Sequence, residues 1–187
     1  RGCTGKPMNT IPLFLYVMAG VAYAFYFARR SAPAGRVATV TLVFGALVHT
    51  FVIGMQTMQV GHIPFVGTTG AISAFVWLLA LAYLYTELTT DERAMGVFII
   101  PILIGLQTIP VVSPGVERMD PVLDSPWFWV HVSSLLFAYA SFALACVIGI
   151  TYMLLFKELK AKQVGIFYSR LPSLRVLDAM NQRAVTV

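Results

Sequence analysis

Three histidines are the side chains in this 187-residue sequence that could most readily do chemistry. His49 and His131 lie inside long apolar segments, and His62 lies in a short segment that also contains Gly61 and Pro64. Burying a titratable side chain among apolar groups is costly, so a histidine in such a segment is a candidate functional residue. A neutral imidazole can bind a metal through one ring nitrogen while the other nitrogen donates a hydrogen bond. The histidines therefore indicate a site that binds through imidazole.

His49 and His131 each share a helix face with small and polar side chains. Helical spacing aligns His49 with Thr41, Gly45, Val52, Gln56 and Gln59, and aligns His131 with Trp127, Ser134, Ala138, Ser141, Ala145 and Gly149. Small side chains let helices approach closely, so we expect both faces to point toward other helices. Trp127 lies one turn before His131 and would cover it with an aromatic ring.

The spacing of the histidines limits which ligands they could bind together. His49 and His62 are 13 positions apart, about 20 Å along a helix, so both cannot bind one small ion without a sharp bend. A flat macrocycle such as haem takes one imidazole from each of two helices and suits aromatic walls. An alternative stays open for each histidine: a hydrogen-bonded core residue at His49, an interfacial residue at His131 and a solvated loop residue at His62.

The composition is that of a membrane protein. Hydrophobic residues make up 58% of the chain and charged residues only 11%, whereas a soluble domain is about 45–50% apolar and about 25% charged. A soluble chain of this size cannot bury so much apolar surface. A soluble enzyme, a disordered tail and a nucleic-acid-binding module are therefore excluded, despite the net charge of +5. The expected surroundings are a lipid bilayer.

Five apolar segments are long enough to cross a bilayer, which takes about 20 residues of helix. They cover about 11–28, 37–58, 67–86, 95–112 and 126–156. None shows the alternation of a membrane-spanning strand, so we predict an all-α, polytopic membrane helix bundle of about five transmembrane helices over residues 1–156. We expect no carboxylate inside a span, with Glu87 in a loop, which argues against a carboxylate-based proton relay.

Residues 157–187 are expected to form a basic cytoplasmic segment that leads into a further span. The spacing of Leu171, Leu174 and Leu177 predicts an amphipathic helix on the cytoplasmic face, and a solvated basic linker is the alternative. Ten of the 13 lysines and arginines fall after the first, third and fifth spans. Because cytoplasmic loops carry the excess of these residues, we place the amino terminus and the loops 59–66 and 112–125 outside.

Three stretches carry a recognisable pattern. Residues 123–133 read Leu-Asp-Ser-Pro-Trp-Phe-Trp-Val-His-Val-Ser, and Ala-Tyr-Ala follows at 138–140. Residues 48–50 read Val-His-Thr and lead to Gly-His-Ile-Pro at 61–64, and residues 177–185 read Leu-Asp-Ala-Met-Asn-Gln-Arg-Ala-Val. In order and separation, nearly along the whole chain, these stretches resemble the cytochrome c assembly proteins of the CcsA/ResC type.

This resemblance implies a polytopic protein of the bacterial inner (plasma) membrane that binds haem b and delivers it near the outer face to apocytochrome c. A second cytochrome c biogenesis membrane subunit is an implied partner. The chain would be at most part of a haem-attachment (synthase) complex. Alternatives are a non-catalytic scaffold or haem-synthesis regulator of the same architecture, and a small-solute transporter with a fourth span kinked at Pro101.

Carried over residue by residue, the resemblance makes His131 an external axial ligand of the haem iron and His49 an inner axial ligand. Trp127 and Trp129 would form walls of the haem site, and His62 matches only a loop position. The family's tryptophan-rich loop and its two partner histidines would lie beyond Val187, so we expect this stretch of chain to bind haem weakly without them.

Overall fold

Six α-helices form the fold of this computed structural model, which describes residues 5–65, 67–113, 125–161, 165, 168 and 170–186. They are α1 (Gly5–Arg29), α2 (Ala32–Val60), α3 (Gly67–Thr90), α4 (Gly96–Val112), α5 (Pro126–Lys160) and α7 (Leu174–Thr186). No strand occurs among these residues, which confirms the all-α prediction. Most of the loop predicted at 112–125 lies outside the described residues.

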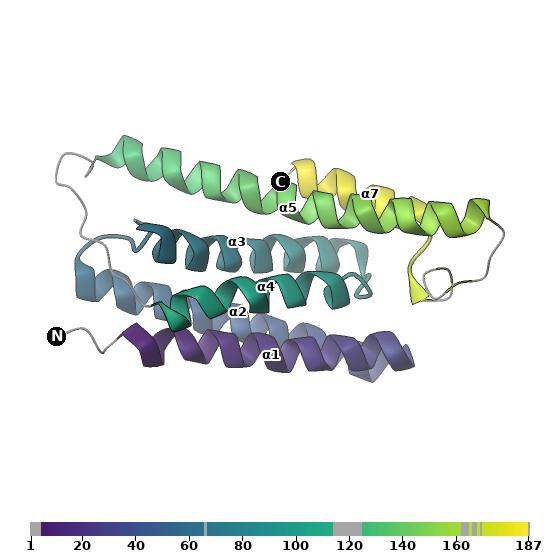
Figure 1. Cartoon of the computed structure of the whole chain (residues 1–187), viewed down its shortest axis with the longest axis horizontal. Coiled ribbons are helices and arrows are strands. Elements are labelled where there is room, and N and C mark those ends of the chain that lie inside the picture. The colour runs from purple at the N-terminus through teal and green to yellow at the C-terminus, as the bar shows by residue number, and fades with distance from the viewer. Residues whose placement is uncertain are drawn as a thin grey trace.

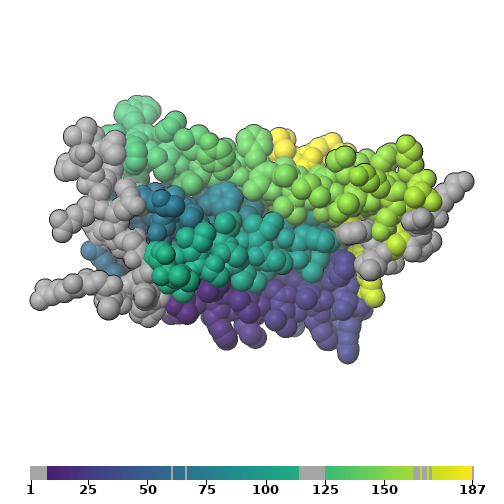
Figure 2. Space-filling view, viewed as in Figure 1, coloured from purple at the N-terminus to yellow at the C-terminus, as the bar shows by residue number. Residues whose placement is uncertain are grey.

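Successive helices run in opposite directions, and α3 lies in the middle of the bundle (Figure 1). Helix α3 contacts α2, α4, α5 and α7, whereas α1 contacts α2 and α4. Figure 2 shows α4 on the viewed face, between α1 and α5. We call the end with residues 61–65, Ser113 and Ser125 the histidine end, and the end with Arg29–Ser31 and residues 90–95 the arginine end.

The interior of the bundle is apolar and contains three buried tyrosines. Tyr16, Tyr23 and Tyr83 are fully buried together with aliphatic side chains such as Leu42 and Ile99. Helix α5 joins this core through one stripe of side chains at helical spacing, formed by Ala140, Leu144, Ile148, Thr151 and Leu155. Through this stripe α5 becomes part of the shared apolar core.

The outside of the bundle is also apolar. Phe14, Phe44, Leu47 and Phe51 are each more than half exposed on α1 and α2. Helices α1, α2, α3 and α5 are long and apolar enough to cross a membrane, and α4 is a shorter apolar helix of 17 residues. Such a surface suits lipid. The five predicted spans fall on these five helices, and where the membrane boundaries lie along them stays a prediction.

The tail forms a helix, α7, that packs against α5 and α3. Leu177, Met180 and Ala184 form its buried side, and the Arg183 side chain donates a hydrogen bond to the carbonyl of Thr89 at the end of α3. The predicted amphipathic helix is confirmed from Leu174 on, whereas Leu171 lies in a bend before it. Its apolar side is covered by neighbouring helices.

Candidate functional site

His49 lies in the centre of the bundle between three helices. Its side chain is fully buried. The Tyr16 hydroxyl of α1 lies 2.9 Å from Nδ1, and the Ser73 hydroxyl of α3 lies 3.0 Å from Nε2. The Tyr16 ring also meets the imidazole edge-on, with ring centroids 5.7 Å apart. Around Gly45, His49 and Val52, which are all buried, the predicted small, polar face of α2 therefore does point toward other helices.

Both ring nitrogens of His49 are occupied by these two contacts. A neutral imidazole has one donor and one acceptor nitrogen, and a hydroxyl can serve either, so the two hydroxyls satisfy the ring completely. This is the hydrogen-bonded core histidine that the sequence left open as an alternative. An iron atom could reach His49 only after Tyr16 or Ser73 had moved away.

His131 lies in a different environment, near the histidine end of α5. Ser125 caps this helix by accepting a hydrogen bond from the Phe128 backbone N–H at 3.2 Å, and Pro126 begins it. The first turns are therefore well defined, yet His131 is exposed and Trp127, on the same face, is 83% exposed. The close helix approach expected for this face is not found at Trp127 and His131 among the described residues, because no side chain of α5 before Ala140 is buried.

The small-residue face of α5 does meet a helix farther from His131, along its contact with α7. We call this contact the α5–α7 seam. A cavity of about 260 Å³ lies there, lined by Ser134, Phe137, Ala138, Ser141, Phe142 and Val185. It begins one helical turn from His131. The Ser141 hydroxyl is buried and forms no hydrogen bond among the described residues.

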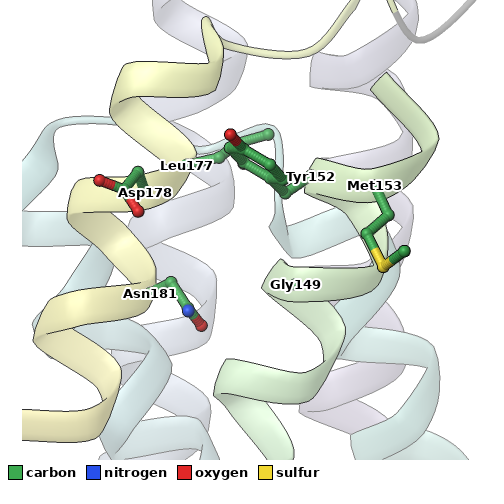
Figure 3. Close-up of a pocket in the computed structure, with 6 residues that line it drawn as sticks. All are labelled: Gly149, Tyr152, Met153, Leu177, Asp178 and Asn181. Atoms are coloured by element: carbon green, nitrogen blue, oxygen red, sulfur yellow. The ribbon is translucent and has the colours of Figure 1, made fainter. Parts of the chain in front are cut away.

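A second cavity, of about 390 Å³, lies farther along the same seam (Figure 3). Figure 3 shows Asp178 and Asn181 on α7 beside Gly149, Tyr152 and Met153 on α5. The buried Oδ1 atom of Asn181 has no hydrogen-bond partner in the described part of the chain. The seam is thus less tightly filled than the core around His49.

His62 and Trp129 come together at the histidine end, although they are far apart in the sequence. Their rings stack with centroids 6.2 Å apart and an interplanar angle of 22°. Gly61 ends α2 in the left-handed conformation, with φ of 81°, and turns the chain toward this contact. Trp129 therefore packs against the 61–65 loop, away from the exposed face that Trp127 shares with His131.

A buried carboxylate at the arginine end was missed by the sequence analysis. Glu87 lies inside α3, not in a loop, and its side chain is fully buried. It accepts hydrogen bonds of 2.5 Å from the hydroxyls of Tyr23 and Thr39, and the Arg93 Nε lies 3.9 Å from its Oε1 atom. These partners supply the donors that a buried carboxylate needs. The expectation that Glu87 lies in a loop after the third span is therefore wrong, because α3 continues to Thr90 and the whole helix is apolar enough to cross a membrane.

A comparison with known proteins identifies the family of this chain. The family model described as cytochrome C assembly protein matches residues 9–187. The chain belongs to the cytochrome c assembly protein family. No solved structure matches the chain.

Curated relatives of this family carry the name cytochrome c biogenesis protein CcsA. The protein from Synechococcus elongatus is 22% identical over 164 residues, which are 83% of this chain and 49% of the relative. The protein from Trieres chinensis is 20% identical over 79% of this chain and 48% of its own length. The protein from Chlorella vulgaris is 29% identical over 55% of this chain and 34% of its own length. The chain thus spans about a third to a half of the length of these curated relatives.

Membership of the cytochrome c assembly family, together with four long apolar helices, makes this an integral membrane protein. Among the candidate ligands for a flat iron-containing ring, His131 alone combines an exposed imidazole with an aromatic ring one turn away and a cavity one turn beyond. His49 has no such space, because hydroxyls occupy both of its nitrogens. No cluster of three or more His, Cys, Asp or Glu suited to a metal ion occurs in the described residues.

Proposed function

We propose that this protein takes part in cytochrome c assembly by holding haem at the histidine end, with the His131 imidazole as an axial ligand of the iron. The observation that carries the proposal is the exposed imidazole of His131 beside an open part of the α5–α7 seam. The family to which the chain belongs supports the choice of haem as the cargo, and of apocytochrome c as the protein that receives it.

The residues near His131 suit a flat apolar ring. Trp127 is available to stack on such a ring, since its side chain is 83% exposed on the same helix face. Phe137 and Phe142 line the cavity that begins one turn farther along α5, and small side chains between them leave room for the ring edge. In cytochrome c assembly, haem supplies the vinyl groups that form thioether bonds with acceptor thiols. The role of this chain is to bind and orient it.

Trp129 supports the site indirectly in this proposal. Its ring stacks on His62 and so ties the 61–65 loop to the start of α5. This contact fixes the end of the helix from which His131 projects. For Trp129 to form a wall of the haem site, as the resemblance to the family implies, its side chain would have to adopt a different rotamer.

His49 remains a proposed inner axial ligand only in a second arrangement of the bundle. In that arrangement, Tyr16 or Ser73 would have to release one imidazole nitrogen, and α1 or α3 would have to move to admit the ring. The arrangement described here favours a structural role for His49. A scaffold in cytochrome c assembly is therefore the second candidate function, because this histidine is already satisfied by hydrogen bonds.

The proposed orientation puts the histidine end outside the membrane and the arginine end in the cytoplasm. It rests on the excess of lysine and arginine at the arginine end and in the segment after α5. In a bacterium the membrane would be the inner (plasma) membrane. A second biogenesis subunit would then present apocytochrome c to the histidine end from outside.

The haem content of the purified complete protein tests this proposal. We expect the wild-type protein from haem-replete cells to carry haem with a visible Soret band, and His131→Ala to lose most of it. Val130→Ala is the matched control, because Val130 is 61% exposed next to His131 and has no ligating atom. Haem-free wild-type protein would favour the scaffold, and an unchanged haem content in His131→Ala would overturn the assignment of this ligand.

A further inference from the structure

A cleft between α1 and α2 opens on the surface near the arginine end, far along the helices from His131. Its volume is about 430 Å³. The side chains that line it include Met18, Val21 and Phe25 of α1, and Ala34, Val37 and Thr41 of α2. Val21 and Val37 are each more than half exposed, so the cleft faces the surroundings of the bundle. In an integral membrane protein, an apolar cleft on this outer surface faces lipid.

The length of the cleft matches one leaflet of a bilayer. From Ser31, which precedes α2, to Thr41 within it, the lining covers a rise of about 15 Å along the helix axis. The hydrocarbon core of a bilayer is about 30 Å thick, so each leaflet contributes about half of that depth. An acyl chain whose headgroup lies at the arginine end would therefore fill the cleft as far as Thr41, near the middle of the membrane.

Positive charge lies near the mouth of the cleft. The Arg29 guanidinium lies over the ring of Phe25, a lining residue, with the Cζ atom 4.8 Å from the ring centroid. Arg36 is exposed in the first turns of α2. No acidic residue opposes these charges on either helix, since Glu87 is the first acidic residue of the whole chain. Glu87 is itself buried and already accepts hydrogen bonds from Tyr23 and Thr39.

We propose that this cleft binds one anionic phospholipid, with an acyl chain between α1 and α2 and the headgroup phosphate held by Arg29 and Arg36. The apolar lining, Arg29 over Phe25 and the exposed Arg36 directly before the lining residue Val37 together match the two parts of such a lipid. Arg30 is not part of this site, because its guanidinium donates a hydrogen bond to the carbonyl of Arg170. This proposal does not depend on haem binding.

Lipid titration of the complete, delipidated protein, followed by native mass spectrometry, tests the proposal. The probes are phosphatidylglycerol and phosphatidylcholine with identical acyl chains. We expect the wild-type protein to retain the anionic lipid preferentially, and its affinity to fall about fivefold for each arginine removed in Arg29→Gln and Arg36→Gln. Arg175→Gln is the matched control, because Arg175 is an exposed arginine of α7 and does not line the cleft.

A second pair of variants locates the bound lipid independently of charge. Ala34→Phe should fill the cleft and lower the occupancy of the anionic lipid, whereas Ala24→Phe should leave it unchanged, since Ala24 is exposed on α1 outside the lining. Equal retention of both lipids by the wild-type protein would overturn the proposed phosphate contact. Full occupancy in Ala34→Phe would show that the lipid binds elsewhere.

Discussion

The surroundings of His49 and His131 differ in almost every physical respect, although the two residues looked alike in the sequence. His49 is fully buried between α1, α2 and α3, and each of its ring nitrogens contacts a hydroxyl. His131 is exposed on α5, beside an exposed tryptophan and the open part of the α5–α7 seam. One imidazole is fully satisfied within the protein, and the other is free to meet a ligand from outside.

This difference separates a histidine that stabilises the fold from one that is available for binding. A buried polar group contributes to specificity when all its hydrogen bonds are made, and it becomes costly when one partner is lost. An exposed imidazole contributes little to folding and can exchange its partners. The comparison therefore predicts that the two histidines respond in opposite ways to measurements of stability and of binding.

The largest expected effect on stability comes from removing His49. His49→Ala leaves the hydroxyls of Tyr16 and Ser73 buried without their partner and opens a cavity, so it should lower the free energy of unfolding by about 2–4 kcal/mol. His131→Ala removes an exposed side chain and should change it by less than about 0.5 kcal/mol. Thermal unfolding of the two variants and the wild-type protein in the same detergent measures both changes in stability. Equal losses of unfolding free energy in the two variants would contradict the proposed difference between the two histidines.

A smaller effect is expected when only one contact of His49 is removed. Tyr16→Phe keeps the buried ring but deletes the hydroxyl 2.9 Å from Nδ1, which should cost about 0.5–1.5 kcal/mol. Tyr139→Phe is the matched control, because Tyr139 is 60% exposed on α5 and should tolerate the same change. The same unfolding assay distinguishes them. If Tyr16→Phe unfolds like the wild-type protein, the Tyr16 hydroxyl does not stabilise His49.

Much of the fold could be predicted because it depends on local sequence. The length and polarity of each apolar segment predicted five apolar helices, of which four are long, and leucine spacing predicted an amphipathic helix in the tail. The face of α2 that holds His49 was also predicted to point inward, since small residues recur along it at helical spacing. These inferences needed no knowledge of which helices would become neighbours.

The features that sequence analysis missed all depend on contacts between distant segments. Glu87 can be buried because Tyr23, Thr39 and Arg93 bring donors and positive charge from two other helices and from the turn after α3. No pattern in the sequence near Glu87 predicts these partners. The exposure of His131 likewise depends on where along α5 the other helices pack, since the buried residues of this helix begin only at Ala140.

Chemical rescue of position 131 tests the account most directly. His131→Gly in the complete protein should lose the Soret band of bound haem, and added imidazole should restore the band at its wild-type position, because the free ring can occupy the space of the missing side chain. Tyr16→Phe combined with Ser73→Ala, which changes only the surroundings of His49, should keep haem bound without added imidazole. Wild-type haem binding by His131→Gly in the absence of imidazole would contradict the claim that this histidine holds the iron.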